Sequence, residues 1–253
     1  MSIGVTSLKA TKTTLEIINS VQELNGAGVS ELAERLGKPT STVHDHLRTL
    51  ESEEYLVKQD GTYHISARFL ELGEQVRSRL KVYNIARPEV DALAEQSGEH
   101  ANLLVEEHGR GVFVYKSLGP DAVQLDTHAG MRVHLPTTAL GKAILANRPR
   151  HEIDEILDRH GLPPVTKNSI TDREELFDQL ETVRERGYAV DDEERLPGMR
   201  CVAAPITDNT DRAVAAVSVS CPKSRLTGKR FEETIPNMVL RSANVIEVNL
   251  AYS

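Results

Sequence analysis

Residues 29–50, VSELAERLGKPTSTVHDHLRTL, constrain the fold more than any other stretch, because they read as two short helices joined by a tight turn. An apolar stripe at helical spacing marks the first helix, and Ser30 is its candidate N-cap. Gly37 suits the position that ends a helix, and Pro39 prevents the helix from continuing. Two helices so closely joined are typical of a helix-turn-helix.

The second half of this stretch predicts an amphipathic helix. Val43, Leu47 and Leu50 share one face and are expected to be buried. The opposite face carries Ser41, Thr42, His44, Asp45, Arg48 and Thr49. Small hydroxyl side chains ahead of an arginine suit a helix whose N-terminal end enters the major groove of DNA. The pattern therefore predicts a DNA-binding helix-turn-helix.

A hairpin is expected directly after these two helices. Residues 55–59 and 62–66 flank Asp60-Gly61, which is the strongest two-residue signal for a tight β-hairpin. The order of elements predicts a winged helix, with Lys58 near the tip of a wing that can lie along a phosphate strand. The alternative interpretation is a small helical bundle whose hairpin takes no part in DNA binding.

Length and composition limit the remaining classes of protein. A chain of 253 residues suits two domains, each large enough to bury a core. No apolar run approaches the roughly 20 residues that span a bilayer, and the N-terminus MSIGVTSLKATKTT lacks a hydrophobic signal core. Two cysteines, Cys201 and Cys221, are too few for a disulfide framework. We therefore expect a cytoplasmic protein without a membrane segment.

The charge is unusual for a protein that binds DNA. The chain has 38 acidic and 30 basic residues, and its first 80 residues hold 11 acidic against 9 basic side chains. We therefore expect a few individually placed phosphate contacts and a shallow salt dependence. Arginine outnumbers lysine 20 to 10, which hints at a salt-adapted host such as an archaeon. The candidate phosphate contacts are Lys9, Lys12, Lys38, Arg48, Lys58 and Arg68.

Apolar periodicity predicts the other elements. A helix over 8–24 should face inward with Leu8, Leu15, Ile18, Val21 and Leu24, and a helix over 67–81 should have an apolar side made of Phe69, Leu70, Leu72 and Val76. Further helices are expected from Arg87-Pro88 to Gly98 and over 138–147, 151–160, 172–186 and 229–250. Strands are expected over 101–107, 112–118, 123–127, 187–191, 201–207 and 213–220.

These elements predict an α+β fold in two parts. Strands and helices follow one another without a regular βαβ order, so the C-terminal sheet should be largely antiparallel. We expect a winged helix-turn-helix DNA-binding domain at 1–66, a linker helix at 67–82 and an effector-binding domain at 83–253. Sheets with helices on both faces often hold a small-molecule pocket at their rim. The organisation predicts a DNA reader joined to a sensor.

Several strings of residues resemble one family over essentially the whole chain. They are SELAERLGKPTSTV, LRTLESEEYLV and TYHIS running into LELG, then PTTALGKAILA, YAVDDEERLPGMRCVAAPI and AVAAVSVSCP. The most specific is the Asp-Glu-Glu…Gly…Cys-x-Ala-Ala-Pro-Ile string, in combination with an N-terminal winged helix. With these strings the chain resembles the isocitrate-lyase-regulator (IclR) family of transcription regulators.

The resemblance implies a winged helix-turn-helix joined by a linker helix to an effector-binding domain similar to the GAF fold. It also implies a homodimer or tetramer that binds a palindromic double-stranded DNA operator and has no enzymatic activity. A small metabolite, an organic or sugar acid, would modulate that binding. Repressors and activators both occur in the family.

Carried over to this sequence, the family's DNA contacts fall on the second helix and the wing. The candidates are Lys38, Thr40, Ser41, Thr42, His44, Asp45, Arg48 and Lys58. Members commonly have arginine where Asp45 stands and an apolar residue where His46 stands. Because an aspartate accepts from a cytosine N4 but repels phosphates, the operator should differ from those of other members. His46 is interpreted as a cap on the edge of the core.

The resemblance also implies a pocket in the C-terminal part. Its candidate residues are Leu125, Val133, Thr138, Ala139, Leu140, Asp191, Cys201, Ser218 and Ser220. Ser218 and Ser220 alternate on one strand, so both hydroxyls face the same side, and the start of the 138–147 helix could help to hold a carboxylate. The alternative is that the two serines form the solvent face of a half-buried strand. This chain has His134-Leu135-Pro136 where members usually have Pro-Leu-His, so we expect the preceding loop to differ in shape.

Two apparent chemical motifs are interpreted as structural. Gly141-Lys142 lacks the glycine and the Ser or Thr that a phosphate loop requires. The acidic run Asp192-Glu193-Glu194 is interpreted as a solvated turn. No cofactor is therefore expected from either motif.

Cys201 leaves two chemical alternatives open. It is interpreted as a buried, inert thiol, whereas a zinc site would combine it with Asp191 and with His128 or His134. A second functional hypothesis treats the C-terminal part as a metabolite-binding or hydrolytic domain, dimerised by an N-terminal module that does not bind DNA. Turnover of a metabolite that is lost on substitution of Cys201 or Asp191 would favour it.

Overall fold

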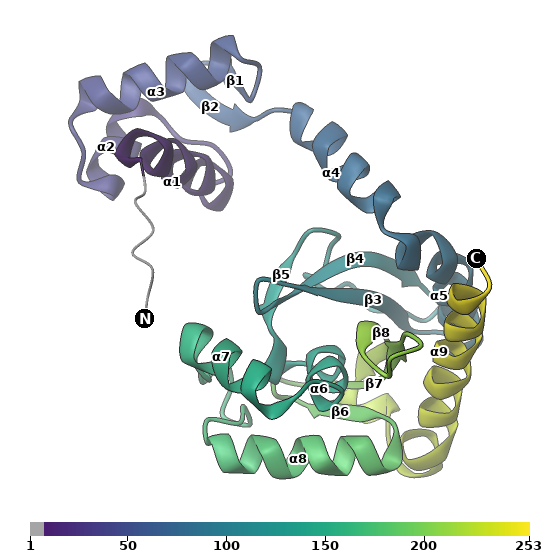
Figure 1. Cartoon of the computed structure of the whole chain (residues 1–253). Coiled ribbons are helices and arrows are strands. Elements are labelled where there is room, and N and C mark those ends of the chain that lie inside the picture. Colours follow the sequence, from purple (N-terminus) through teal and green to yellow (C-terminus); the bar gives the residue numbers. More distant parts are fainter. Residues whose placement is uncertain (1–7) are drawn as a thin grey trace. The chain divides into compact units, whose positions relative to one another are not determined.

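The computed structural model describes residues 8–253 and divides into two compact units at Val76 and Arg77 (Figure 1). The N-terminal unit contains the three helices and the hairpin that the sequence predicts. Its elements are α1 (Lys9–Glu23), α2 (Val29–Leu36), α3 (Thr40–Ser52), β1 (Leu56–Gln59) and β2 (Thr62–Ile65), followed by α4 (Arg68–Arg79). The predicted order of helices and strands is confirmed in this part of the chain.

The hairpin of the N-terminal unit closes as its sequence predicts. Strands β1 and β2 pair antiparallel, with Lys58 opposite Tyr63. Asp60 and Gly61 take φ angles of +48° and +85°, which is the left-handed backbone of the tight turn favoured in hairpins. Ala27 pairs with Tyr63 through both backbone groups, so the hairpin is tied to the segment between α1 and α2.

One apolar cluster holds the N-terminal unit together. It consists of Ile17, Val21, Ala27, Leu32, Ala33, Val43, Leu47, Leu50, Leu56 and Tyr63. Two details of the prediction are wrong. Leu8 and Leu15 are 73% and 55% exposed, because the buried face of α1 runs through Thr13, Ile17 and Ser20 instead. The N-cap of α2 is Gly28 rather than Ser30, and no side chain caps this helix.

Helix α4 has an apolar side that the described chain leaves uncovered. None of its residues is buried, and Leu70, Leu72 and Val76 are all exposed. Gly73 lies within this helix and does not interrupt it. Such a helix is typical of one that packs against another chain.

The C-terminal unit begins with a helix that starts earlier than predicted. Helix α5 runs from Lys81 to Ser97 and contains Pro88 in its interior rather than at its first turn. The residues before the proline include Val82, Tyr83 and Ala86, and all three are buried. Packing of this first part against the core outweighs the helix-breaking tendency of the proline.

A six-stranded antiparallel sheet forms the centre of the C-terminal unit, which confirms the α+β class. Its order is β5-β4-β3-β8-β7-β6. The strands are β3 (His100–Glu107), β4 (Arg110–Leu118), β5 (Arg132–His134), β6 (Ala189–Asp192), β7 (Met199–Thr207) and β8 (Ala213–Pro222). Alternate residues of each central strand face opposite sides, so the sheet supports a separate apolar cluster on each face.

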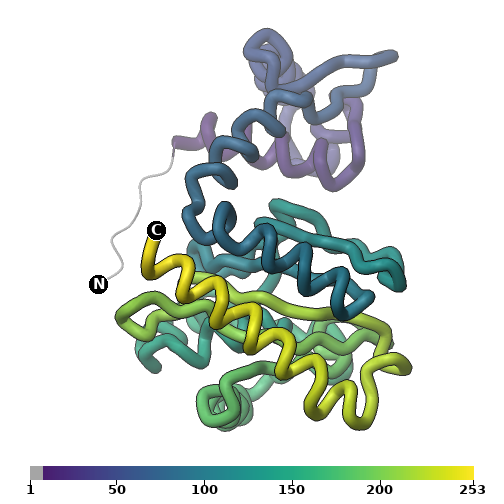
Figure 2. The backbone as a smooth tube through the Cα atoms, turned by 90° about the vertical axis from the view of Figure 1, so that its right-hand side faces the viewer, coloured from purple at the N-terminus to yellow at the C-terminus, as the bar shows by residue number. Residues whose placement is uncertain are grey.

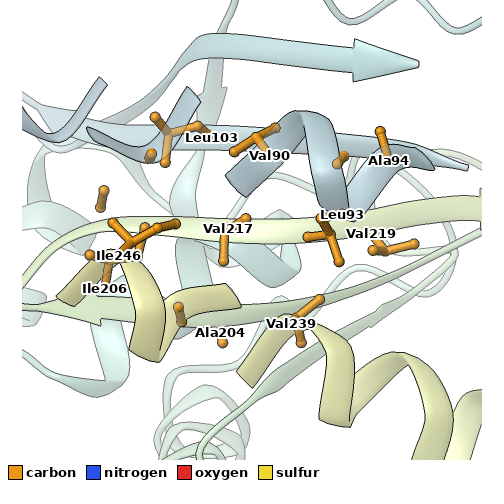
Figure 3. Close-up of a cluster of buried hydrophobic side chains, with 14 of the residues drawn as sticks. Val90, Leu93, Ala94, Leu103, Ala204, Ile206, Val217, Val219, Val239 and Ile246 are labelled. Atoms are coloured by element: carbon orange, nitrogen blue, oxygen red, sulfur yellow. The ribbon is translucent and has the colours of Figure 1, made fainter. Parts of the chain in front are cut away.

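Two helices cover one face of this sheet. Helices α5 and α9 (Ile235–Ala251) lie side by side there (Figure 2). Figure 3 shows the cluster beneath them, to which Val90 and Leu93 of α5, Val217 of β8 and Ile246 of α9 all belong. The predicted helix over 229–250 is divided, because a π-helical turn at Arg230–Thr234 precedes α9.

The other face of the sheet carries α6 (Ala139–Ala146), α7 (Arg150–His160) and α8 (Arg173–Arg186), which correspond to three helices that the sequence predicts. Every residue of α6 is buried. No helix within residues 8–253 is long and apolar enough to cross a membrane.

The strand predicted over 123–127 is absent, and the sixth strand is β5 instead. Carbonyl groups of the 123–127 segment accept hydrogen bonds from side chains. Lys116 Nζ donates to the carbonyls of Leu125 and Thr127 at 3.5 and 3.0 Å, and His100 bonds the carbonyl of Val123. Because side chains satisfy these carbonyl groups, the segment needs no hydrogen bonds to a neighbouring strand and can curve over the sheet.

Candidate functional site

Helix α3 presents a polar face on the surface of the N-terminal unit. Val43, Leu47 and Leu50 are buried, whereas Ser41, His44, Asp45 and Arg48 are exposed and Thr42 is half-buried. Gly37 ends α2 with a left-handed φ of +60°, which turns the chain into α3. The packing of α3 therefore sorts its residues as the amphipathic pattern predicts.

The side chains on this face differ in how they are held. Within residues 8–253, Arg48 makes no hydrogen bond or ion pair, so its guanidinium remains available to a ligand. Asp45 is 84% exposed, and its carboxylate lies 3.9 Å from Nδ1 of His44. His46 is half-buried, and its Nδ1 lies 2.9 Å from Oγ1 of Thr14. This contact supports the interpretation that His46 closes the edge of the core.

The basic residues around α3 are partly neutralised by acidic neighbours. Lys38 Nζ lies 3.3 Å from the Glu16 carboxylate, which also lies 3.9 Å from Lys12. Lys58 places its ammonium 5.0 Å from the ring centre of Tyr63 in the hairpin. Thr40, the first residue of α3, is exposed. A phosphate backbone would therefore compete with Glu16 for Lys38 and Lys12.

The C-terminal unit encloses a cavity of about 40 Å³ on the α6 side of its sheet. Side chains from the sheet, from the start of α6 and from the turns around 123–127 and 195–200 surround it. Its lining consists of Asn102, Phe113, Leu125, Thr127, Thr138, Leu140, Asp191, Arg195, Leu196, Met199, Arg200, Cys201 and Ser220.

Six of the nine predicted pocket residues line this cavity, namely Leu125, Thr138, Leu140, Asp191, Cys201 and Ser220. Val133, Ala139 and Ser218 are buried next to the lining but do not form part of it. Ser218 contacts the lining through Asn102, whose Nδ2 lies 3.4 Å from its hydroxyl. The two serines are therefore not a solvent face.

Sequence reasoning missed the polar lining residues Asn102, Thr127, Arg195 and Arg200. Asn102 reaches the cavity because β3 pairs with β8 so that Asn102 lies opposite Ser218. Such a pairing between distant segments leaves no local signal. Arg200 precedes the predicted Cys201 in β7, and Arg195 lies in the turn between β6 and β7.

Cys201 is held as a neutral thiol. The Ser220 hydroxyl donates a hydrogen bond to the Cys201 sulfur at 3.0 Å. Burial, followed by the nearby Asp191 carboxylate, raises the pKa of Cys201 to about 12. A thiolate nucleophile or zinc ligand is therefore unfavourable at neutral pH. No group of three or more potential metal-ligating side chains occurs in the described part of the chain.

Asp191 is a buried carboxyl group at the edge of the cavity. Its Oδ1 accepts a hydrogen bond from the backbone N–H of Glu194 at 2.7 Å. Burial, reinforced by the charge of Glu194, raises the pKa of Asp191 to about 7. This carboxyl group can therefore gain or lose a proton near neutral pH.

Behind Asp191 lies a buried ion pair that the sequence did not predict. Lys142 of α6 is fully buried and donates to Oε1 of Glu194 at 2.5 Å and to Oε1 of Gln179 at 3.0 Å. Glu194 is 6% exposed, so its assignment to a solvated turn is wrong. The charge of Lys142 draws this carboxylate inward, which fixes the turn that also holds Asp191.

The start of α6 reaches the cavity through Thr138 and Leu140. Thr138 caps the helix, since its Oγ1 accepts from the N–H of Gly141 at 2.9 Å. A Cβ atom on Gly141 would lie 2.1 Å from the carbonyl oxygen of Leu135, so only glycine permits this close approach. The first N–H groups of a helix have no intrahelical partner and favour an anion.

Two arginines add positive charge to the lining, and each already has an acidic partner. Nη2 of Arg195 lies 2.8 Å from both carboxylate oxygens of Asp126. Arg200 binds Asp192 through two nitrogens at 2.9 and 2.8 Å. Asp126 is the more exposed of the two carboxylates, so Arg195 is the arginine that a ligand carboxylate could more readily recruit.

Family profiles match both units. The profile described as the IclR helix-turn-helix domain matches residues 12–60, and the one described as the IclR C-terminal domain of bacterial transcriptional regulators matches residues 74–248. The chain is 35% identical over 241 residues to a probable HTH-type transcriptional regulator, ArcR, of Halobacterium salinarum. That alignment covers 93% of this chain and 91% of the relative.

Solved structures agree with the fold over nearly the whole length. The crystal structure of IclR from Thermotoga maritima superposes with a TM-score of 0.78 at 31% identity, covering 97% of this chain and 100% of that one. An IclR homologue from Microbacterium hydrocarbonoxydans, crystallised in complex with 4-hydroxybenzoate, superposes with a TM-score of 0.79 at 23% identity, covering 95% and 100%.

These matches agree with the geometry of both sites. A helix-turn-helix with an exposed polar face is joined to a domain that encloses a polar cavity, and relatives with the same two parts are transcriptional regulators rather than enzymes. The chain therefore belongs to the IclR family of DNA-binding transcription regulators.

Proposed function

We propose that residues 1–66 bind a palindromic DNA operator, that residues 67–82 connect the domains, and that residues 83–253 bind a small organic or sugar acid. The observation that carries the DNA-binding part is the sorting of α3, in which three apolar residues are buried and the hydroxyl-and-arginine face is exposed. A cell's DNA lies in the cytoplasm in bacteria and archaea, so we expect the protein to act there.

The candidate DNA contacts differ in what they would recognise. Ser41, Thr42, His44, Asp45 and Arg48 lie on α3, where they can reach base edges in the major groove. The remaining candidates, Lys38, Thr40 and Lys58, lie at the turn before α3 and on the hairpin. Their contacts would position the domain on the phosphates.

A homo-oligomer follows from the same proposal. A palindrome presents two equal half-sites, and a two-fold dimer reads them about one helical turn apart. The uncovered apolar side chains of α4, Leu70, Leu72 and Val76, support a second copy as the partner. Dimer and tetramer both satisfy this requirement.

The cavity supports the effector-binding part. It combines helix N–H donors, arginine and hydroxyl groups, which are the groups that bind a carboxylate. The homologue from Microbacterium hydrocarbonoxydans holds an aromatic hydroxy acid. The alternative of a hydrolytic domain lacks support, because burial keeps Cys201 protonated.

Selection of DNA from a random library by the full-length protein tests the proposal. We expect enriched sequences with two inverted half-sites. Arg48→Ala should weaken binding of the selected site by about 10- to 100-fold, which corresponds to about 1–3 kcal/mol for one base contact. Arg159→Ala, at an exposed position of α7, is the matched control and should leave binding unchanged. Equal binding by both variants would contradict the proposal.

A further inference from the structure

Two buried polar atoms around the cavity have no hydrogen-bond partner. They are Oδ1 of Asn102 and Oγ1 of Thr127, and both residues line the cavity. Asn102 is 2% exposed and Thr127 is 7% exposed. Buried polar groups in proteins are nearly always paired, so two unpaired atoms around one cavity point to groups that a ligand supplies.

The orientation of the Asn102 side chain follows from its neighbours. Its Nδ2 donates to the hydroxyl oxygens of both Ser218 and Ser220, each at 3.4 Å. Ser220 uses its own proton to bond the Cys201 sulfur, so it accepts from Asn102. A reversed amide would place an oxygen against Ser220, whose proton is already used, and would lose one of these two hydrogen bonds. The atom left for the ligand is therefore Oδ1, which can only accept a hydrogen bond.

The size of the cavity limits the ligand. A volume of about 40 Å³ corresponds to about three water positions, well below the roughly 300 Å³ or more of a pocket for a drug-sized ligand. Acids with two to four carbon atoms therefore need the least rearrangement of the lining. A sugar acid or an aromatic acid would have to displace parts of the wall, such as Leu125 or Leu196.

The lining of the cavity carries both donors and acceptors. The start of α6 and Arg195 offer donors, which suit a carboxylate. Asn102 offers an acceptor, which suits a hydroxyl group and repels a carbonyl oxygen. We propose that the effector is a small 2-hydroxy acid, whose hydroxyl donates to Asn102 Oδ1, and that the site discriminates against the corresponding 2-oxo acid. This inference rests on the proposed effector-binding function of the cavity.

The test compares three acids of equal length on the full-length protein: lactate, pyruvate and propionate. Isothermal titration calorimetry should show lactate binding at least tenfold more tightly than either of the others. A carbonyl facing Asn102 leaves that buried acceptor unpaired, and sites built to bond a hydroxyl reject analogues that lack it. Equal or tighter binding of pyruvate would overturn the proposal.

The Asn102→Leu variant locates the source of this preference. It keeps a similar volume but removes the acceptor, so the ratio of lactate to pyruvate affinity should fall to about one. Asn237→Leu, at an exposed position of α9, is the matched control and should keep the ratio of the unmodified protein. A tenfold preference that survives in Asn102→Leu would show that another group reads the hydroxyl, and would contradict the proposal.

Other acids distinguish an error in the identity of the ligand from an error in the effector-binding function. If none of the three acids binds but 4-hydroxybenzoate or a sugar acid does, the small hydroxy acid is wrong and effector binding stands. If no acid binds and none alters operator binding, the effector function itself is wrong. Both results overturn the inference made here, and only the second also overturns the proposed function.

Discussion

Helices α3 and α6 carry residues of the two candidate sites and are built in opposite ways. Helix α3 buries one apolar stripe and leaves its polar face to the surface. Helix α6 is buried on every side, and even its Lys142 lies inside the protein with Glu194 as its partner. Substitutions on the exposed face of α3 should therefore change recognition with little effect on stability, whereas substitutions on α6 should change stability first.

The largest expected effect tests the buried ion pair of α6. Lys142→Met leaves the Glu194 carboxylate buried without its cation, so we expect the free energy of unfolding of the C-terminal unit to fall by about 3–5 kcal/mol. Urea denaturation followed by circular dichroism measures it. The double variant Lys142→Met/Glu194→Leu should recover most of the loss. Lys167→Met, at an exposed lysine, is the control and should change stability by less than about 0.5 kcal/mol.

The next comparison uses one helical glycine from each unit. Gly141→Ala would place a Cβ atom 2.1 Å from the Leu135 carbonyl oxygen, so we expect a loss of about 3 kcal/mol. Gly73→Ala in α4 meets no atom within 4 Å and should stabilise that helix by up to about 1 kcal/mol. Thermal unfolding of both variants shows whether each substitution lowers or raises the stability of the protein. A destabilised Gly73→Ala protein would mean that a second chain packs closely on α4.

The stability of the protein at several pH values tests the titration of Asp191 in the cavity wall. Asp191 has a pKa near 7 when folded and an ordinary value of 3.8 when unfolded. Between these values the folded state keeps a proton that the unfolded state releases, so stability falls as the pH rises towards 7 and then levels off. Asp191→Asn cannot ionise and lacks this fall. The free energy of unfolding of this variant, relative to that of the unmodified protein, should therefore rise by about 2–3 kcal/mol between pH 5 and pH 8.

Urea midpoints at several pH values measure this difference. Asp211→Asn, at an exposed loop aspartate, is the control and should follow the unmodified protein. A difference between Asp191→Asn and the unmodified protein that does not change with pH would show that Asp191 is ionised throughout the range.

The smallest effect concerns the acidic residue on α3. Asp45→Asn removes a negative charge from an exposed position beside the proposed phosphate contacts, so affinity for non-specific DNA should rise a few-fold. Any preference for cytosine at the facing position should weaken at the same time. Retardation assays at two salt concentrations measure the change. Glu155→Gln on α7 is the control, and an equal rise in both variants would point to net charge alone.

The difference between the two helices also decides what the sequence could predict. Helix α3 buries only one apolar stripe, so the spacing of its apolar residues in the sequence reveals both the helix and its polar face. Helix α6 shows no such contrast, and its polar contacts run to residues 37 and 52 positions away. The burial of Lys142 and Glu194 therefore depends on tertiary contacts that no local pattern contains.

Local patterns and long-range contacts also explain which elements of the fold could be predicted. The Asp60-Gly61 turn and the strands of the hairpin were predictable because the turn needs a left-handed backbone. The 123–127 segment was predicted as a strand from its composition, but side chains of His100 and Lys116 bind its carbonyl groups. Asn102, which the sequence did not indicate, reaches the cavity only because β3 pairs with β8. Local chemistry predicts turns and amphipathic faces, whereas pairing across the sheet requires the structure.

The way Lys116 holds the 123–127 segment has a consequence for access to the cavity. Leu125 and Thr127 belong to the cavity wall, and one ammonium group fastens both of their carbonyls. Detaching a strand would break a whole row of backbone hydrogen bonds, whereas side chains alone, Lys116 and His100, hold the carbonyl groups of this wall. We therefore expect a metabolite to enter past the 123–127 segment while the six strands remain paired.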